Sequence, residues 1–120
     1  MELLMLTAAG GAVGAVVRYL VGMLASAVWG SSFPWGTLAV NSMGSFLMGA
    51  VCACQISAPA STFLMQGFCG ALTTFSTFSL DNFRLFREGK SGRAAANIFM
   101  NLAFGIGAAA VGFMLFGETA

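Results

Sequence analysis

The chain has 120 residues, of which 58% are hydrophobic and 8% are charged, and its mean hydropathy is +0.89. This composition excludes an ordinary soluble domain and indicates a membrane protein. The five basic residues are also too few to form a binding face for nucleic acid. Because one transmembrane helix needs about 20 residues, the chain has room for about four such helices and for no additional domain.

The apolar runs predict an all-α membrane protein with one four-helix transmembrane domain, its helices at residues 3–29, 35–57, 62–86 and 94–117. Short turns, SSFP and SAPAS, separate the first three helices. Trp29 and Trp35 flank the first turn and mark one membrane interface. No basic residue precedes the first apolar run and no cleavage-like polar break follows it, so we expect this helix to be retained and not removed as a signal peptide.

All five basic residues are predicted to lie toward one side of the membrane: Arg18, Arg84, Arg87, Lys90 and Arg93. Four of them surround the loop between the third and fourth helices, and Arg18 tends toward the loop after the first helix, on the same side. The positive-inside rule then predicts cytoplasmic loops there and both chain termini outside.

Small residues recur at four-residue spacing in Gly10 and Gly14, Ser45 and Gly49, Gly105 and Ala109, and Ala108 and Gly112. Such pairs allow two helix backbones to approach closely in a membrane, where lipid competes for apolar side chains. We therefore expect tight contacts within the bundle and with a second copy of the chain.

Few residues suggest catalysis, and we do not expect an enzyme. The chain has no histidine, and its four acidic residues, including Asp81, are placed near the membrane borders. The glycines of GGAVGAVVR lack the spacing and the preceding strand of a dinucleotide site. Cys52, Cys54 and Cys69 lie in apolar sequence and are expected to be buried free thiols.

A polar stripe runs along the second helix, where Thr37, Asn41 and Ser45 follow one another at four-residue spacing. Two interpretations remain open at this point. The residues hold helices together through weak polar contacts, or they line a hydrated path that contacts ions. Asn97 and Asn101 on the fourth helix present the same choice, and there we favour a path lining.

The segment GALTTFSTFS, residues 70–79, places five hydroxyls and two phenyl rings where hydrocarbon side chains are expected. Gly67, Gly70, Thr73 and Thr74 make this stretch weakly helical, so we predict a broken helix at mid-membrane depth. Freed carbonyl groups there suit a hard cation, whereas freed N–H groups at the start of the second half-helix suit an anion. The positive edges of phenyl rings can also face a small anion.

Arg18 would be costly at the centre of a helix, by about 2.5 to 3.5 kcal/mol on insertion scales. Its side chain therefore either extends to the membrane interface or reaches a vestibule. In an anion pathway, a vestibule arginine raises the local concentration of anions at the pore mouth.

Three segments, GGAVGAVVRY (10–19), PWGTLAVNSMGSFLMG (34–49) and GFCGALTTFSTFS (67–79), resemble the CrcB/Fluc family of small bacterial fluoride channels. The resemblance covers essentially the whole chain. It implies a passive, multi-pass channel of the bacterial inner membrane that exports fluoride and so reduces its toxicity. It also implies an antiparallel, dual-topology dimer with a broken third helix, two fluoride pores and a central structural sodium ion.

By position, the resemblance assigns Phe75, Phe78 and Asn41 to the fluoride pore. Ser76 and Thr77 match hydroxyls near the ion path, and Arg18 matches the arginine of the first helix. The backbone carbonyls of Gly70 and Thr73 match the sodium ligands. Thr37, on the same stripe as Asn41, and Asn101 complete the expected pore lining.

Two departures from the family pattern affect the expected assembly. The polar positions of the fourth helix correspond to Asn101, Gly105 and Ala109, of which only Asn101 has a polar side chain. The one-sided basic residues are also unusual for a homodimer that inserts in both orientations. We therefore keep two assemblies open, an antiparallel homodimer, which we prefer, and a heterodimer with a related chain that supplies missing pore groups.

Two other functions are considered. Small proton-coupled multidrug exporters also form antiparallel four-helix dimers, but they carry a carboxylate within the first helix, where this chain has only Glu2 at the start. A structural partner subunit that conducts nothing is the other alternative, suggested by the sparse polar track of the fourth helix.

Overall fold

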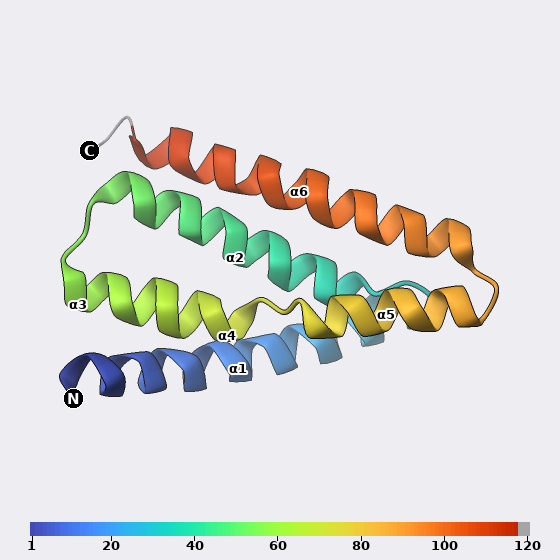
Figure 1. Ribbon diagram of the computed structural model, residues 1–120, viewed down its shortest axis with the longest axis horizontal. Helices are drawn as coiled ribbons and strands as arrows, with labels where there is room; N and C mark the ends of the chain where they lie inside the picture. Colours follow the sequence, from blue (N-terminus) through green and yellow to red (C-terminus); the bar gives the residue numbers. More distant parts are fainter. Residues whose placement is uncertain (118–120) are drawn as a thin grey trace.

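Four helical rods lie side by side in the computed structural model, which describes residues 1–117 (Figure 1). Three rods are single helices: α1 (Glu2–Trp29), α2 (Trp35–Cys54) and α6 (Ser91–Gly117). The other rod is a series of segments: α3 (Ala58–Ser61), the π-helix η1 (Thr62–Cys69), α4 (Gly70–Leu72) and α5 (Ser76–Arg87). Helices α1, α2 and α6 are long and apolar enough to cross a membrane. The chain is thus an all-α membrane protein, as the composition predicts.

The predicted boundaries need correction on both sides of the turn between α2 and α3. Helix α2 ends at Cys54 and not at residue 57, because Gln55 adopts a left-handed conformation with φ 53°. The SAPAS segment, expected as a turn, is helical from Ala58. The Ser57 hydroxyl accepts a hydrogen bond from the Ala60 N–H, and Pro59 occupies the first turn, where a missing N–H does no harm.

The predicted break in the third rod is present at residues 73–75, between α4 and α5. Thr73 has an extended backbone, with φ −81° and ψ 158°, so the helix cannot continue through it. The eight residues before α4 form a π-helix, which the sequence analysis did not predict. Long π-helical runs are rare and are frequently found near functional sites.

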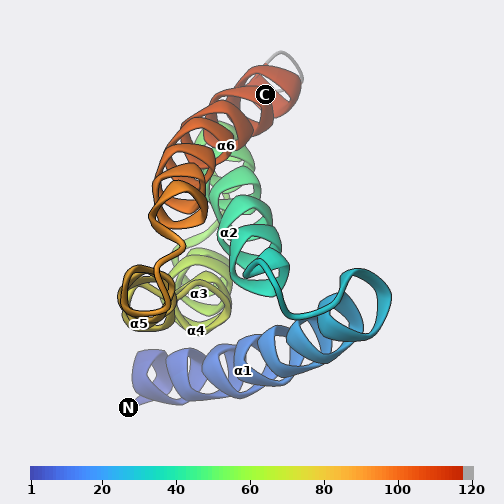
Figure 2. The ribbon, with the colours of Figure 1, turned by 90° about the vertical axis from the view of Figure 1, so that its right-hand side faces the viewer.

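Glycines set the packing of the rods, as the four-residue spacing predicts. A Cβ atom on Gly10 or Gly14 would overlap backbone carbonyls of η1, at Phe63 and Phe68. Likewise, Gly49 of α2 lies against the Ala109 backbone of α6. In the end-on view, α1 lies on one side of the broken rod and α6 lies with α2 on the other (Figure 2).

The two ends of the bundle differ in charge. The α1–α2 and α5–α6 connections share one end, and the start of α1 and the end of α6 lie at the other (Figure 1). The Arg93 guanidinium, in the first turn of α6, donates a hydrogen bond of 3.4 Å to the Ser32 carbonyl in the α1–α2 connection. The predicted shared side of these loops is confirmed, whereas their cytoplasmic location remains a prediction.

The cysteine prediction is confirmed in part. All three cysteines are free thiols, but only Cys69 is buried, and Cys52 is exposed on α2. Exposure of Cys52 to lipid is compatible with its apolar character, because a thiol behaves as a small hydrophobic group.

We expect Gly112→Val to separate α2 from α6 and to reduce stability by about 1–3 kcal/mol. The new side chain would overlap the Phe46 carbonyl and contact the Ala50 backbone, neither of which can move like a flexible side chain. Gly107→Val is the matched control on the same helix, because nothing lies within 4 Å of a Cβ atom there. Unfolding in detergent mixtures, followed by circular dichroism, measures the difference, and equal stability of the two variants would contradict the packing assignment.

Candidate ion pathway

The side chain of Asn41 in α2 forms hydrogen bonds with the backbone at the helix break. Its side-chain Oδ1 accepts a hydrogen bond of 2.9 Å from the Thr74 N–H, and its Nδ2 donates one of 3.2 Å to the Thr74 carbonyl. The amide thus pairs with both backbone groups of one residue, as a neighbouring peptide would. The Thr74 N–H is consequently unavailable to the Gly70 carbonyl, its acceptor in a continuous helix.

A second side chain diverts the next hydrogen bond of the broken rod. The Thr77 N–H donates to the Thr74 hydroxyl at 3.1 Å, and not to the Thr73 carbonyl four residues earlier. The Gly70 and Thr73 carbonyls, which are predicted to bind sodium, therefore lose their helical donors to other groups. Backbone carbonyls without helical partners are suitable ligands for a hard cation, so these residues fit the predicted role.

One side of the break opens into a cavity of about 340 Å³, which we call the Phe groove. Phe75 and Phe78 form one wall, with ring centroids 5.8 Å apart and planes inclined at 42°. The complete lining consists of Asn41, Ser45, Met48, Thr73, Thr74, Phe75, Phe78, Asn101 and Leu102. None of these side chains is titratable. Phe75 is 78% exposed in the single chain, so its outer face is available to lipid or to another subunit.

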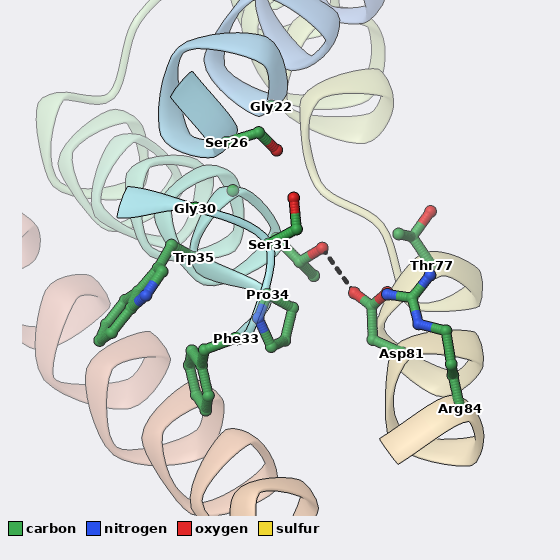
Figure 3. A pocket seen from close by; sticks show the side chains of 12 residues that line it. Gly22, Ser26, Gly30, Ser31, Phe33, Pro34, Trp35, Thr77, Asp81 and Arg84 are labelled. Atoms are coloured by element: carbon green, nitrogen blue, oxygen red, sulfur yellow. Dashed lines mark hydrogen bonds and ion pairs between the residues drawn. The ribbon is translucent and has the colours of Figure 1, made fainter. Parts of the chain in front are cut away.

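A polar crevice lies beyond Thr74, between α1 and the α2–α5 pair. It consists of two cavities of about 280 and 270 Å³ that share Gly22, Gly36, Thr37 and Thr77, and we call it the vestibule crevice. Arg18 lines one of its cavities together with Thr74. Asp81 and Arg84 line the other, across from the turn that connects α1 to α2 (Figure 3).

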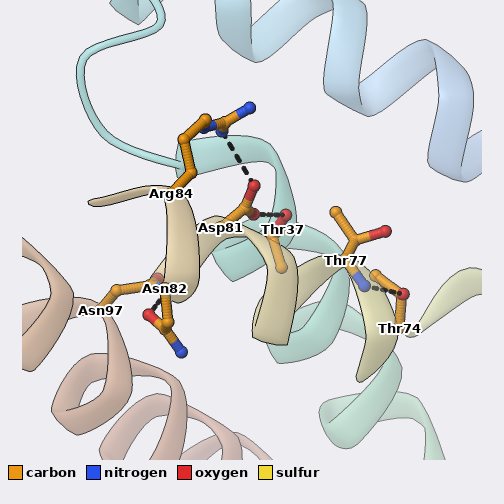
Figure 4. Close-up of polar contacts among 7 residues, drawn as sticks. All are labelled: Thr37, Thr74, Thr77, Asp81, Asn82, Arg84 and Asn97. Carbon is orange, nitrogen blue, oxygen red and sulfur yellow. Dashed lines mark hydrogen bonds and ion pairs between the residues drawn. The ribbon is translucent and has the colours of Figure 1, made fainter. Parts of the chain in front are cut away.

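Asp81 is the charged centre of the vestibule crevice and was not predicted as a site residue. Its side chain accepts a hydrogen bond of 2.9 Å from the Thr37 hydroxyl and one of 3.0 Å from the Arg84 guanidinium (Figure 4). Asp81 is only 6% exposed, so it is buried within the bundle; its expected place near a membrane border remains a prediction. Thr77, Asp81 and Arg84 share one face of α5, but this spacing alone does not reveal that Asp81 is buried.

A chain of amides connects the break to α6 and back to α5. Asn41 Nδ2 donates to Asn101 Oδ1 at 3.1 Å, and Asn101 Nδ2 donates to the carbonyl and Oδ1 of Asn97 at 2.8 and 2.9 Å. Asn97 Nδ2 then donates to Asn82 Oδ1 at 2.8 Å (Figure 4). The expectation that Asn97 lines a path is wrong, because its side chain is fully buried and joins α5 to α6.

The structure divides the predicted pore residues between the two cavities. Asn41, Phe75, Phe78 and Asn101 meet at the Phe groove, and Arg18, Thr37 and Thr77 meet at the vestibule crevice. Ser76 lines neither cavity, and its hydroxyl lies 3.4 Å from that of Thr74. The polar stripe of α2 faces the two cavities and also makes contacts within the chain. Thr37 donates to a carboxylate, and Asn41 donates both of its amide hydrogens.

Comparison with known proteins shows that residues 5–113 match the family described as "CrcB-like protein, Camphor Resistance (CrcB)". The chain belongs to the CrcB family. The matched range contains every residue that lines the Phe groove and the vestibule crevice. The resemblance seen in the sequence motifs is thereby confirmed.

Curated CrcB relatives carry a more specific name. "Fluoride-specific ion channel FluC 1" of Thermobifida fusca is 44% identical over 113 residues, which cover 94% of each chain. "Fluoride-specific ion channel FluC" of Vibrio cholerae serotype O1 is 45% identical over 111 residues, 88% of each chain. The protein of the same name from Shewanella sp. strain ANA-3 is 48% identical over 106 residues, 85% of this chain and 86% of the relative.

Proposed function

We propose that this chain is a fluoride-selective ion channel that lets cytoplasmic fluoride leave the cell passively. The relatives named fluoride-specific channels, with 44% to 48% identity over at least 85% of the chain, carry this proposal. The Phe groove supports the proposal physically, because it places polar groups at the helix break. A bundle of unbroken apolar helices would offer an ion no polar route across the hydrocarbon.

The lining of the Phe groove suits a small anion better than a cation. The rings of Phe75 and Phe78 have positive edges, and the groove contains no carboxylate that would repel an anion. The N-terminus of α5, which begins between Phe75 and Phe78, adds the positive end of a helix dipole. These partial charges can replace part of the hydration of fluoride without binding it as tightly as a full positive charge would.

The vestibule crevice is the proposed entrance on the loop side of the bundle. Arg18 has no ion-pair partner among the residues that the structure describes, so its charge is available to attract anions. Arg84 is paired with Asp81 and contributes less net charge. The opposite charges within the crevice would limit how long an anion stays there, as permeation requires.

Passive transport follows from the composition of the Phe groove. A proton-coupled carrier needs a titratable group that meets its substrate, and no side chain of the groove can titrate. Asp81 lies outside the groove, and its two oxygens accept hydrogen bonds from Thr37 and Arg84. We place the channel in the bacterial inner membrane, where fluoride that entered as neutral acid ionises in the cytoplasm and then leaves down its gradient.

The proposed assembly is an antiparallel homodimer around a structural sodium ion. The carbonyls of Gly70 and Thr73 are too few to surround a cation, and the same pair from a second copy would complete a set of hard oxygen ligands. Because the phenyl rings and Asn41 are all present in this one chain, it does not need a related partner to supply them. A heterodimer is therefore not favoured.

Fluoride efflux from liposomes that contain this chain alone tests the proposed function. A potassium ionophore removes the limiting voltage, and chloride efflux from the same liposomes is the selectivity control. We expect rapid fluoride loss with negligible chloride loss. Fluoride retention by liposomes that contain folded, assembled protein would contradict the proposal.

A further inference from the structure

Thr74 lies at the junction of the two cavities. It lines the Phe groove together with Phe75 and Phe78, and it lines the vestibule crevice together with Arg18 and Thr77. Within residues 1–117, Thr74 alone belongs to the lining of both the groove and the crevice. An ion that moves from one cavity to the other therefore passes this residue.

The position of Thr74 is fixed by hydrogen bonds on each of its polar groups. Its N–H and carbonyl pair with the Asn41 amide, and its hydroxyl oxygen accepts the Thr77 N–H at 3.1 Å. The residue is 9% exposed. A side chain held in this way is already positioned at the junction and loses no further conformational freedom when an ion arrives.

The Thr74 hydroxyl retains a proton that it can donate. A hydroxyl has one donor hydrogen and two acceptor lone pairs, and the bond from Thr77 uses a lone pair. The other neighbour of the oxygen is the Ser76 hydroxyl at 3.4 Å, a distance at which a hydrogen bond is weak. The proton can therefore turn toward an anion at the junction.

We propose that Thr74 is a selectivity-determining residue whose hydroxyl donates a hydrogen bond to the anion as it passes between the crevice and the groove. This inference rests on the proposed channel function. A hydrogen bond to a charged acceptor is stronger when the two atoms approach closely, and a small anion approaches a hydroxyl more closely than a large one does. The Thr74 hydroxyl thus favours fluoride over chloride at the junction of the two cavities, in addition to any preference from the phenyl rings.

The test compares fluoride and chloride efflux from liposomes for several substitutions of Thr74. Thr74→Val removes the hydroxyl at nearly constant shape, and we expect it to slow fluoride efflux at least about tenfold. Thr74→Ser retains the hydroxyl and should restore the rate to within about twofold, a smaller change than loss of a hydrogen bond causes. Thr62→Val is the matched control, because Thr62 is equally buried at 9% and lies in η1 away from both cavities. Fluoride efflux at the wild-type rate from Thr74→Val would overturn the inference.

Loss of the bond from Thr77 is a separate effect of Thr74→Val, and Thr74→Asp distinguishes the two roles. Aspartate is a strong acceptor for N–H groups at the start of a helix, but its ionised side chain has no proton to give. A Thr74→Asp protein that conducts fluoride like the wild type would overturn the inference. If Thr74 contacts the anion, Thr74→Asp is as stable as the wild type and nearly silent, because its carboxylate has no proton to donate and repels the anion.

The same experiment separates this inference from the proposed function. Rapid fluoride efflux from the wild type, with unchanged efflux from Thr74→Val, would overturn the role of Thr74 and leave the channel function intact. Silence from assembled wild-type protein would overturn both.

Discussion

Phe78→Ile is expected to slow fluoride efflux by at least about tenfold while the protein remains folded and assembled. Isoleucine fills much of the same volume and keeps the wall of the Phe groove apolar. It has no ring and therefore no positive edge to face an anion. Fluoride is strongly hydrated, so the loss of one compensating contact leaves a larger dehydration barrier.

Phe46→Ile is the matched control for this substitution. Phe46 also belongs to an aromatic pair, with a ring centroid 6.3 Å from that of Phe116, but it does not line the Phe groove. If aromatic packing alone mattered, both variants would lose stability and flux together. Wild-type efflux from an assembled Phe78→Ile protein would contradict the ring-edge mechanism.

The membrane character and the broken rod were predictable because they depend on local composition. Within the hydrocarbon, the backbone polar groups of a helix must be hydrogen-bonded inside the protein. Glycine and hydroxyl residues clustered at mid-depth weaken the helix and can provide such bonds, so they indicate a break. The predicted weakly helical residues, Gly67, Gly70, Thr73 and Thr74, include two residues of the observed break at 73–75, whereas Gly67 and Gly70 are helical. The π-helix before it was not predictable, because its hydrogen-bond pattern depends on how η1 packs against Gly10 and Gly14 of α1.

The partners of the polar side chains could not be derived from spacing alone. The stripe of Thr37, Asn41 and Ser45 shares one face of α2, yet Thr37 contacts Asp81 and Asn41 contacts the Thr74 backbone. Which partner each residue meets depends on the placement of α5 after the break. The burial of Asp81 is hidden in the sequence for the same reason, because Asp81 lies only three residues before Arg84 and looks like part of a charged loop.

Asn41 shapes the backbone at the helix break, a role that its predicted contact with the ion did not include. As a direct ligand it would need a free amide hydrogen, but both hydrogens are donated, to the Thr74 carbonyl and to Asn101. Its main effect is therefore on the backbone. By taking the Thr74 N–H it frees the Gly70 carbonyl, and so the same residue that borders the Phe groove also prepares the proposed sodium site.

Removal of sodium is expected to weaken dimerisation strongly. A ligand that binds only the assembled state stabilises it by about 2.7 kcal/mol when its concentration is a hundred times its Kd. Replacing sodium with a large organic cation should therefore raise the dimer dissociation constant by up to about a hundredfold. Energy transfer between labelled subunits in liposomes measures this shift. Equal dimer populations with and without sodium would contradict the assignment of the Gly70 and Thr73 carbonyls.

Asn41→Leu provides the matched variant for the sodium experiment, since backbone ligands cannot be removed by substitution. Without the amide, the Thr74 N–H is free to donate to the Gly70 carbonyl and to extend α4. The carbonyl then has a partner within the chain and no longer needs a cation. We expect dimerisation of Asn41→Leu to be weaker than that of the wild type in sodium and nearly insensitive to sodium removal. A sodium response as large as that of the wild type would mean that Asn41 does not free the carbonyl that binds the ion.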